Sequence, residues 1–313
     1  MTHLTTTKND TTGDALEKAR NLELPSREAM LLRDNSVQAF WDNNRQLLKN
    51  AWLEWENKET TDLIFPDESL LDSNLRRAIE QAWANPEKEM LVKELMSEAS
   101  PGVFQFQFFD PERLTELRRY FDAVASANIP LKPPYGIALN RYGAMLDARS
   151  EGYLAAPSFQ AFYKILIDQY MRPIARLLFP EILGFDTQAF GFSIQYEAGV
   201  DTSLRMHTDA SAATLNINLN LPSETFTGSQ VDFYDPKTRN MNRLSFEPGM
   251  AMIHKGSVAH AAQPIQSGQR SNLVLWLFGE GGYIPHKIEA DSSVTAYDRW
   301  QVPNTEQDSY APF

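Results

Sequence analysis

The stretch SLRMHTDASAATLNINLNL, residues 203–221, decides the fold prediction for this chain. Polar and apolar residues alternate over most of its length, a pattern typical of β-strands with one buried face. On a strand, residues two apart point to the same side, so His207 and Asp209 are able to bind one ion together. A His-x-Asp tripeptide also occurs by chance, so the pair alone is weak evidence for a metal site.

Two further residues strengthen the metal prediction. His260 lies in MIHKGSVAHAAQPI (252–265), and Arg270 stands just before the apolar run NLVLWLF (272–278). Two imidazoles and one carboxylate, with the remaining positions open, form the ligand set of non-haem ferrous iron sites. Catalytic zinc accepts the same ligands. Arg270 favours iron, because a guanidinium next to the metal is the natural partner of a carboxylate on an anionic co-substrate.

His254 is an alternative ligand. It precedes His260 by six residues, an even separation that places both side chains on the same face of an unbroken strand. Gly256 and Ser257, however, predict a turn between the two histidines. The sequence therefore favours His260.

From Tyr196 to Phe278 the chain resembles the Fe(II)- and 2-oxoglutarate-dependent dioxygenases, and among them the procollagen lysyl hydroxylases and prolyl 4-hydroxylases. The resemblance is densest in HTDASAATLNINLN (207–220), with a weaker match in KPPYGIALNRYGAML (132–146). It implies a requirement for Fe(II), 2-oxoglutarate and O₂, with ascorbate as a stimulant. The roles that it implies are iron ligation by His207, Asp209 and His260, pairing of Arg270 with the far carboxylate of 2-oxoglutarate, and further co-substrate contacts from Tyr196 and Asn216.

Two of these assignments have structural alternatives. Tyr196 could be a core aromatic without contact to a co-substrate. Asn216, Asn218 and Asn220 share one face of the predicted strand, and Leu and Ile residues occupy the other. Three inward asparagines need hydrogen-bond partners and would indicate a polar cavity, whereas an outward face would be solvated.

Composition limits the function classes. The chain has 313 residues and is 42% hydrophobic, enough for one sizeable core, and no apolar run reaches the ~18 residues of a spanning helix. It contains no cysteine, and its first residues lack the order of a signal peptide, which together predict a cytoplasmic protein without a membrane partner. A net charge of −12 argues against nucleic-acid binding.

The many short alternating segments, broken by turns, predict a mostly β fold with flanking α-helices and a double-stranded β-helix core of the jelly-roll, cupin-like type. Residues 1–14 are predicted as a disordered tail, 15–130 as a mainly helical region packed on the core, and 131–313 as the core with a C-terminal extension. Helices are expected over residues 34–59, from Pro86, from Pro111 to about Ala127, and over 158–179 with a kink at Pro173, and a strand over 103–109.

The function predicted from these features is hydroxylation of an aliphatic C–H bond in a small molecule, such as an amino acid or metabolite. The resemblance implies that succinate and carbon dioxide form from 2-oxoglutarate at the same time. Two alternatives stay open: hydroxylation of lysyl or prolyl side chains in a protein, and a cupin-like sensor that binds metal without turnover.

Overall fold

Two antiparallel sheets dominate the computed structural model, which describes residues 14–32, 34–58, 63–131, 157–285, 293–310 and 312. Within these ranges a larger sheet has the strand order β1 (Ser97–Ser100), β2 (Val103–Gln107), β9 (Met250–Lys255), β5 (Ala213–Asn218), β12 (Gln269–Phe278) and β3 (Gln188–Glu197). A smaller sheet has the order β4 (Leu204–His207), β10 (His260–Ala262), β7 (Val231–Asp235) and β8 (Asn240–Leu244), and β6 (Thr227–Gly228) pairs with β11 (Ile265–Ser267).

The chain crosses repeatedly between the two sheets. It passes from β3 in the larger sheet to β4 in the smaller one and returns in β5, and it crosses again between β9 and β10. Within the part of the chain that the structure describes, every strand pairing of the larger and smaller sheets is antiparallel. This winding is the double-stranded β-helix, so the predicted fold class is confirmed.

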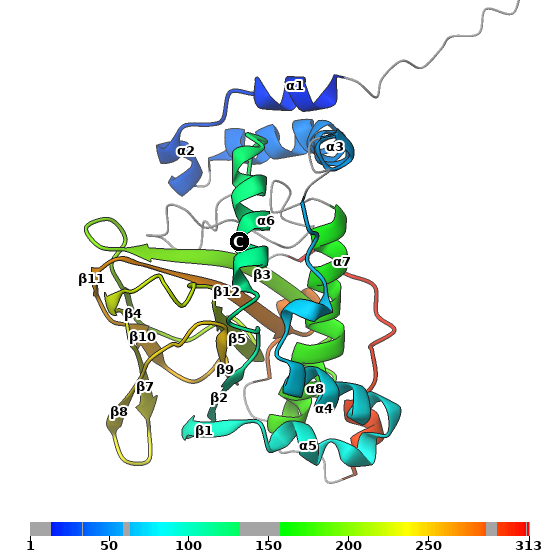
Figure 1. The fold of residues 1–313 in the computed structure, drawn as a ribbon, viewed down its shortest axis with the longest axis vertical. Helices are drawn as coiled ribbons and strands as arrows, with labels where there is room; N and C mark the ends of the chain where they lie inside the picture. The colour runs from blue at the N-terminus through cyan, green and yellow to red at the C-terminus, as the bar shows by residue number, and fades with distance from the viewer. Residues whose placement is uncertain are drawn as a thin grey trace, which may run out of the picture.

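Helices flank the sheets (Figure 1), with α4, α5, α7 and α8 together on one side of the strands. The α-helices of the described residues are α1 (Ala15–Arg20), α2 (Arg27–Leu32), α3 (Asn35–Lys58), α4 (Ser73–Ala84), α5 (Met90–Lys93), α6 (Leu114–Ser126), α7 (Pro157–Ile165), α8 (Arg172–Leu178) and α9 (Ala296–Arg299). Short 3₁₀ turns cover Glu68–Leu70, Pro86–Lys88, Pro180–Ile182 and Glu280–Gly282.

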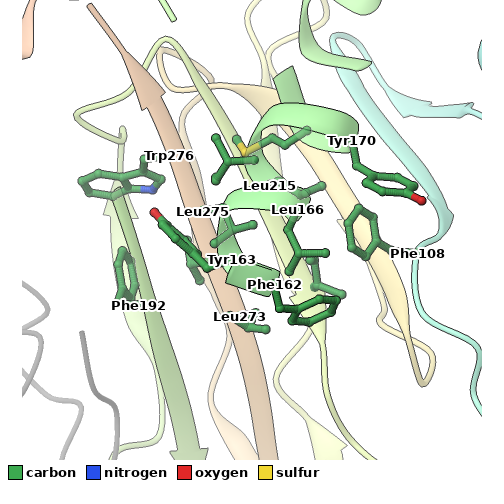
Figure 2. Packing of buried hydrophobic residues seen from close by; sticks show 14 of the residues in the cluster. Phe108, Phe162, Tyr163, Leu166, Tyr170, Phe192, Leu215, Leu273, Leu275 and Trp276 are labelled. Atoms are coloured by element: carbon green, nitrogen blue, oxygen red, sulfur yellow. The ribbon is translucent and has the colours of Figure 1, made fainter. Parts of the chain in front are cut away.

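The helix predicted over 158–179 lies against the outer face of the larger sheet. Figure 2 shows Phe162, Tyr163 and Leu166 packed over Leu273 and Leu275 of β12, all of them members of the main hydrophobic core. A π-helical segment, Leu166–Met171, joins α7 to α8 directly before Pro173. Because proline lacks an N–H group and its ring crowds the preceding turn, a wider turn lets the helix continue past it.

Gly191 on β3 lets this helix approach the sheet. A Cβ atom at this position would lie 2.7 Å from Cε2 of Tyr163 and 3.0 Å from Cδ2 of Leu275. We expect Gly191→Ala to lower the free energy of unfolding by about 1–3 kcal/mol, the usual cost of overpacking a core, as measured by urea denaturation. In a Tyr163→Leu background, where the closest atoms are gone, the same change should cost less. Equal costs in both backgrounds would contradict this packing role.

The predicted helix over 34–59 is confirmed as α3. Trp41 and Trp52 are 0% and 1% exposed and belong to the core, as expected of a packed helix face. Leu53, by contrast, is 47% exposed. It follows Trp52 by one residue, about 100° around the helix axis, and so points away from the core.

Two predicted helix starts are shifted along the chain. Asn85 accepts a hydrogen bond from the Glu87 amide, but the residues after it form a 3₁₀ turn, and α5 follows only at Met90. Asp110 accepts from the Glu112 amide, yet α6 begins at Leu114 because a turn intervenes. Each polar side chain thus caps a turn, and the helix begins a few residues after the predicted position.

The predicted strand over 103–109 is confirmed as β2, which pairs with β9. The division of the chain at residue 131 stays a prediction. The larger sheet includes β1 and β2, which precede that boundary. The predicted tail over 1–14, apart from residue 14, and the segment 132–146 lie outside the described residues.

Candidate metal centre and cavity

His207 and His260 face each other across two paired strands of the smaller sheet. They are direct partners in the register of β4 and β10, and their ring centroids are 4.3 Å apart. Asp209 follows β4 by two residues, and its backbone N–H donates to the Gly256 carbonyl. This contact ties the loop that carries the carboxylate to the turn between β9 and β10.

The three side chains present their ligand atoms to one point. Asp209 Oδ1 lies 3.4 Å from Nε2 of His207 and 3.8 Å from Nε2 of His260, and all three ligand atoms lie within 4.8 Å of one another. Two atoms that each bind an ion at about 2.1 Å and at a right angle are about 3 Å apart. The arrangement therefore fits a single metal ion.

Hydrogen bonds to the backbone hold both imidazoles in the orientation that a metal requires. His207 Nδ1 lies 2.7 Å from the Arg205 carbonyl, and His260 Nδ1 lies 3.0 Å from the Val258 carbonyl. Because a carbonyl only accepts, both Nδ1 atoms carry the proton and donate it. The Nε2 lone pairs are left for the ion, as in most histidine metal sites.

Electrostatics also prepares these groups for a cation. Burial alone would raise the pKa of Asp209, but the neighbouring imidazoles of His207, His260 and His254 outweigh it and hold the pKa well below its usual range. Burial, with a contribution from His254, lowers the pKa of His260 to about 4. At neutral pH the carboxylate is therefore charged and His260 is neutral, which are the forms that bind metal.

Thr214 supports the carboxylate, and the sequence interpretation did not single it out. Its hydroxyl donates to Asp209 Oδ2 at 2.6 Å and lies 2.8 Å from Oγ of Ser211. The oxygen that faces the histidines, Oδ1, remains available. Thr214 stands two residues before Asn216 on the same strand face, so the alternation of β5 could have identified it.

Arg270 is a buried cation. It is 1% exposed, and it stands opposite Tyr196 in the register of β12 and β3. Its guanidinium carbon lies 4.5 Å from the centroid of the Tyr196 ring, and Nη1 donates to the Ser229 carbonyl. Among the described residues no carboxylate forms an ion pair with it, and its Nε has no hydrogen-bond partner.

Such a charge is costly to bury uncompensated, and desolvation lowers the pKa of Arg270. A buried guanidinium that no protein carboxylate neutralises is suited to bind an anion that enters from outside.

One cavity of about 340 Å³ connects the metal centre to Arg270. All six site residues predicted from the sequence line it: His207, Asp209, His260, Arg270, Tyr196 and Asn216. The rest of its wall is mostly apolar and comes from both sheets: Phe192, Ile194, Leu204, Thr208, Ala210, Thr214, Val231, Ala262, Val274 and Trp276.

The predicted asparagine face points inward. Asn216 lines the cavity, whereas Asn218 and Asn220 are 0% and 3% exposed and hydrogen-bond to each other and to β12. The alternative of a solvated outer face is therefore wrong. Only Asn216 lines the cavity, because β12 packs against the side chains of the other two asparagines.

His254 lies behind the metal centre. It belongs to β9 in the larger sheet, and the turn predicted at Gly256 separates it from His260 on β10. Its Nε2 is 4.0 Å from Asp209 Oδ2, the oxygen that Thr214 occupies, and its ring is 4.7 Å from that of His260. It packs against the site without joining the group of possible ligands. His3 and His286 lie outside the described residues.

Known proteins resemble this chain in sequence. The family model of an OGFOD2-like domain matches residues 60–184, the stretch that precedes the metal centre. The 2-oxoglutarate and iron-dependent oxygenase domain-containing protein ICU11 of Arabidopsis thaliana is 29% identical over 196 residues, which cover 58% of this chain and 46% of that protein. The 2-oxoglutarate and iron-dependent oxygenase domain-containing protein 2 of Xenopus tropicalis is 30% identical over 201 residues, which cover 60% of this chain and 52% of that protein. The chain thus spans about half the length of these relatives.

A solved Pseudomonas putida prolyl-4-hydroxylase overlaps with 66% of this chain and 100% of its own, at 15% identity and a TM-score of 0.42. Among the described helices, none has the length and apolar character needed to cross a bilayer. Both relatives are described as 2-oxoglutarate and iron-dependent oxygenase domain-containing proteins, and the chain is similar to them over 58% and 60% of its residues.

Proposed function

We propose that this protein is an Fe(II)- and 2-oxoglutarate-dependent dioxygenase that hydroxylates an aliphatic C–H bond of a small molecule. The observation that carries the proposal is the pairing, in one cavity, of three possible metal ligands with a buried guanidinium that has no carboxylate partner among the described residues. The ligands are His207, Asp209 and His260. Iron bound to them would supply the oxidative chemistry, with 2-oxoglutarate and O₂ as co-substrates.

The chain's own residues position and enclose the reactants. Arg270 binds the far carboxylate of 2-oxoglutarate, and Tyr196 packs beside the guanidinium and limits where that carboxylate can lie. Asn216 contributes a polar contact nearer the metal. The apolar wall keeps water away from the ion and suits the hydrocarbon part of a substrate.

The size of the cavity supports a small substrate. About 340 Å³ is at the low end of the ~300–1,000 Å³ range of small-molecule sites. Phe192, Leu204 and Trp276 offer apolar contact but no charge to a substrate. An amino-acid-sized molecule with an aliphatic chain fits this description.

Turnover of 2-oxoglutarate tests the proposal. Purified protein with Fe(II), ascorbate and O₂ should form succinate and carbon dioxide in equal amounts from 2-oxoglutarate, slowly alone and faster with a substrate. Mass spectrometry of candidate amino acids and of lysyl and prolyl peptides would identify the hydroxylated species. Asp209→Ala protein is the control and should form no succinate.

Three results would count against it. Protein that binds iron and 2-oxoglutarate but forms no succinate would be a sensor. Hydroxylated peptide in place of a free small molecule would move the assignment to protein substrates. Zinc retained through purification, with no response to iron, would point to a hydrolytic centre.

A further inference from the structure

A row of asparagine side chains crosses from the end of β5 to the cavity. Asn220, Asn218, Asn272 and Asn216 lie in this order on the inner face of β5 and β12. Each amide has an oxygen that only accepts and an NH₂ group that only donates. The direction of the hydrogen bonds along the row therefore decides which end of Asn216 can face the cavity.

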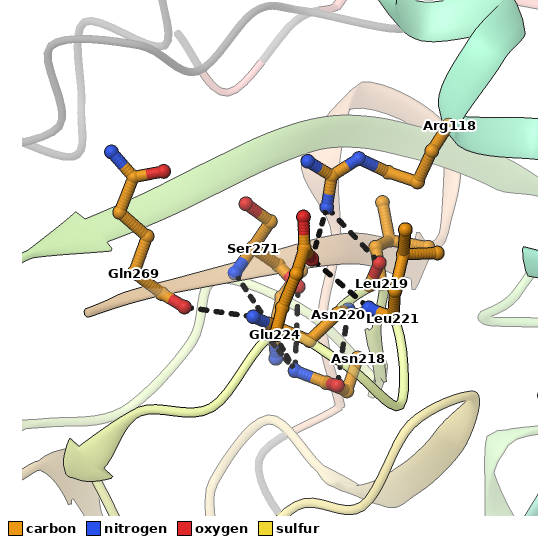
Figure 3. Close-up of polar contacts among 9 residues, drawn as sticks. Arg118, Asn218, Leu219, Asn220, Leu221, Glu224, Gln269 and Ser271 are labelled. Atoms are coloured by element: carbon orange, nitrogen blue, oxygen red, sulfur yellow. Dashed lines mark hydrogen bonds and ion pairs between the residues drawn. The ribbon is translucent and has the colours of Figure 1, made fainter. Parts of the chain in front are cut away.

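Backbone groups fix the direction at the far end of the row (Figure 3). Asn220 Oδ1 accepts from the Ser271 N–H at 3.0 Å, and its Nδ2 donates to the Gln269 carbonyl at 2.7 Å. A backbone N–H only donates and a carbonyl only accepts. The orientation of the Asn220 amide is thereby unambiguous.

The next two amides must follow. Asn218 Oδ1 accepts from the backbone N–H of Asn220 at 3.2 Å, so its Nδ2 is the atom that lies 3.2 Å from Asn272 Oδ1. With its oxygen directed at Asn218, Asn272 has only its Nδ2 to offer in the other direction. It donates this group to Asn216 Oδ1 at 2.5 Å.

The consequence appears at the cavity. The oxygen of Asn216 is occupied, while its Nδ2 has no acceptor among the described residues, and its side chain lines the cavity that holds Arg270. We propose that Asn272 is a positioning residue, which holds the Asn216 NH₂ group toward the cavity so that an oxygen of 2-oxoglutarate meets a donor. This inference rests on the proposed function for the identity of the ligand.

Asn272→Asp should reverse the direction of the hydrogen bond between side chains 272 and 216, because aspartate has nearly the shape of asparagine but only accepts. A carboxylate at position 272 accepts a hydrogen bond, so Asn216 should turn its NH₂ group toward it and present its oxygen to the cavity. We expect the affinity of the anaerobic Fe(II) protein for 2-oxoglutarate to fall about tenfold or more, the usual effect of losing a hydrogen bond to a charged group. Iron affinity should stay close to that of the unchanged protein, whereas thermal stability should fall, because position 272 is fully buried and a carboxylate is costly to desolvate.

A double-mutant cycle separates positioning from the added charge. Asn216→Ala alone should weaken 2-oxoglutarate binding about tenfold. If Asn272 acts through Asn216, Asn272→Asp should cost at least about threefold less in the Asn216→Ala background, because no amide is left to turn. Equal losses in both backgrounds would overturn the proposal, since charge or general damage at position 272 would act without Asn216.

A second measurement needs no co-substrate. In ¹⁵N-asparagine-labelled protein, hydrogen exchange of the Asn216 NH₂ group should be fast and should slow in Asn272→Asp, whereas the fully buried Asn272 NH₂ group should exchange slowly. An Asn216 NH₂ group that is already protected, or that does not respond, would contradict the relay. Protein that binds no 2-oxoglutarate contradicts the proposed function, and the exchange rates then decide the relay alone.

Discussion

Replacing His260 with alanine should abolish 2-oxoglutarate turnover and weaken Fe(II) binding by more than about a hundredfold. Loss of a group that merely orients a ligand typically costs 10- to 100-fold in metal affinity, and the loss of a ligand itself should exceed that. His260 offers Nε2 at 3.8 Å from Asp209 Oδ1, with its Nδ1 already held by the Val258 carbonyl. The measurement is anaerobic Fe(II) titration, with succinate formation as the second readout.

His254→Ala is the matched control. His254 is also a buried histidine, at 1% exposure against 8% for His260, and its ring touches that of His260. The two substitutions leave similar voids, so thermal unfolding should show comparable losses of stability. Iron affinity should nevertheless stay within about tenfold in His254→Ala, less than the 10- to 100-fold typical of groups that support a ligand. A dead His254→Ala protein beside an active His260→Ala protein would mean that the wrong histidine has been assigned.

The positions of His254 and His260 could be predicted from the residues between them. Gly256 and Ser257 predict a turn, and the turn places His254 and His260 on different sheets. The alternation over 203–221 likewise predicts that the asparagines share a face. Both predictions depend on neighbours within a few residues, where strand periodicity and turn preferences are strong.

Long-range register was not available from the sequence. The role of Asn272 follows from its position opposite Asn218 and diagonal to Asn216, which is set by the pairing of β12 with β5. Nothing in the residues around 272 indicates which strand lies beside them. The start of α6 differs from its prediction for a local reason, because Asp110 accepts the same hydrogen bond at the start of a turn as at the start of a helix.

The environment of the Arg270 charge could likewise not be predicted from the sequence. The sequence indicates an arginine before an apolar strand, whereas the lack of a carboxylate partner within the described residues depends on what the fold brings near it. That environment makes a quantitative test possible. The surface arginine of β8, Arg243, pairs with Asp232 at 2.7 Å and serves as its comparison.

Arg270→Ala should lower the affinity for 2-oxoglutarate by about a hundredfold or more while it largely spares iron binding. Removing one partner of a desolvated ion pair costs ~3–5 kcal/mol, and each ~1.4 kcal/mol is tenfold in affinity. Arg270→Lys should fall in between, because lysine keeps the charge but lacks the planar fork of donors. Arg243→Ala, which removes an exposed guanidinium, should leave the affinity unchanged.

The readout is the metal-to-ligand charge-transfer band as 2-oxoglutarate is added to the anaerobic Fe(II) protein. An unchanged midpoint in Arg270→Ala would show that the co-substrate is anchored elsewhere or is a different molecule. A midpoint that shifts equally in Arg243→Ala would show that overall charge, and not the buried contact beside Tyr196, governs binding. The selective effect is expected because only Arg270 lies on the wall of the cavity that holds the metal centre.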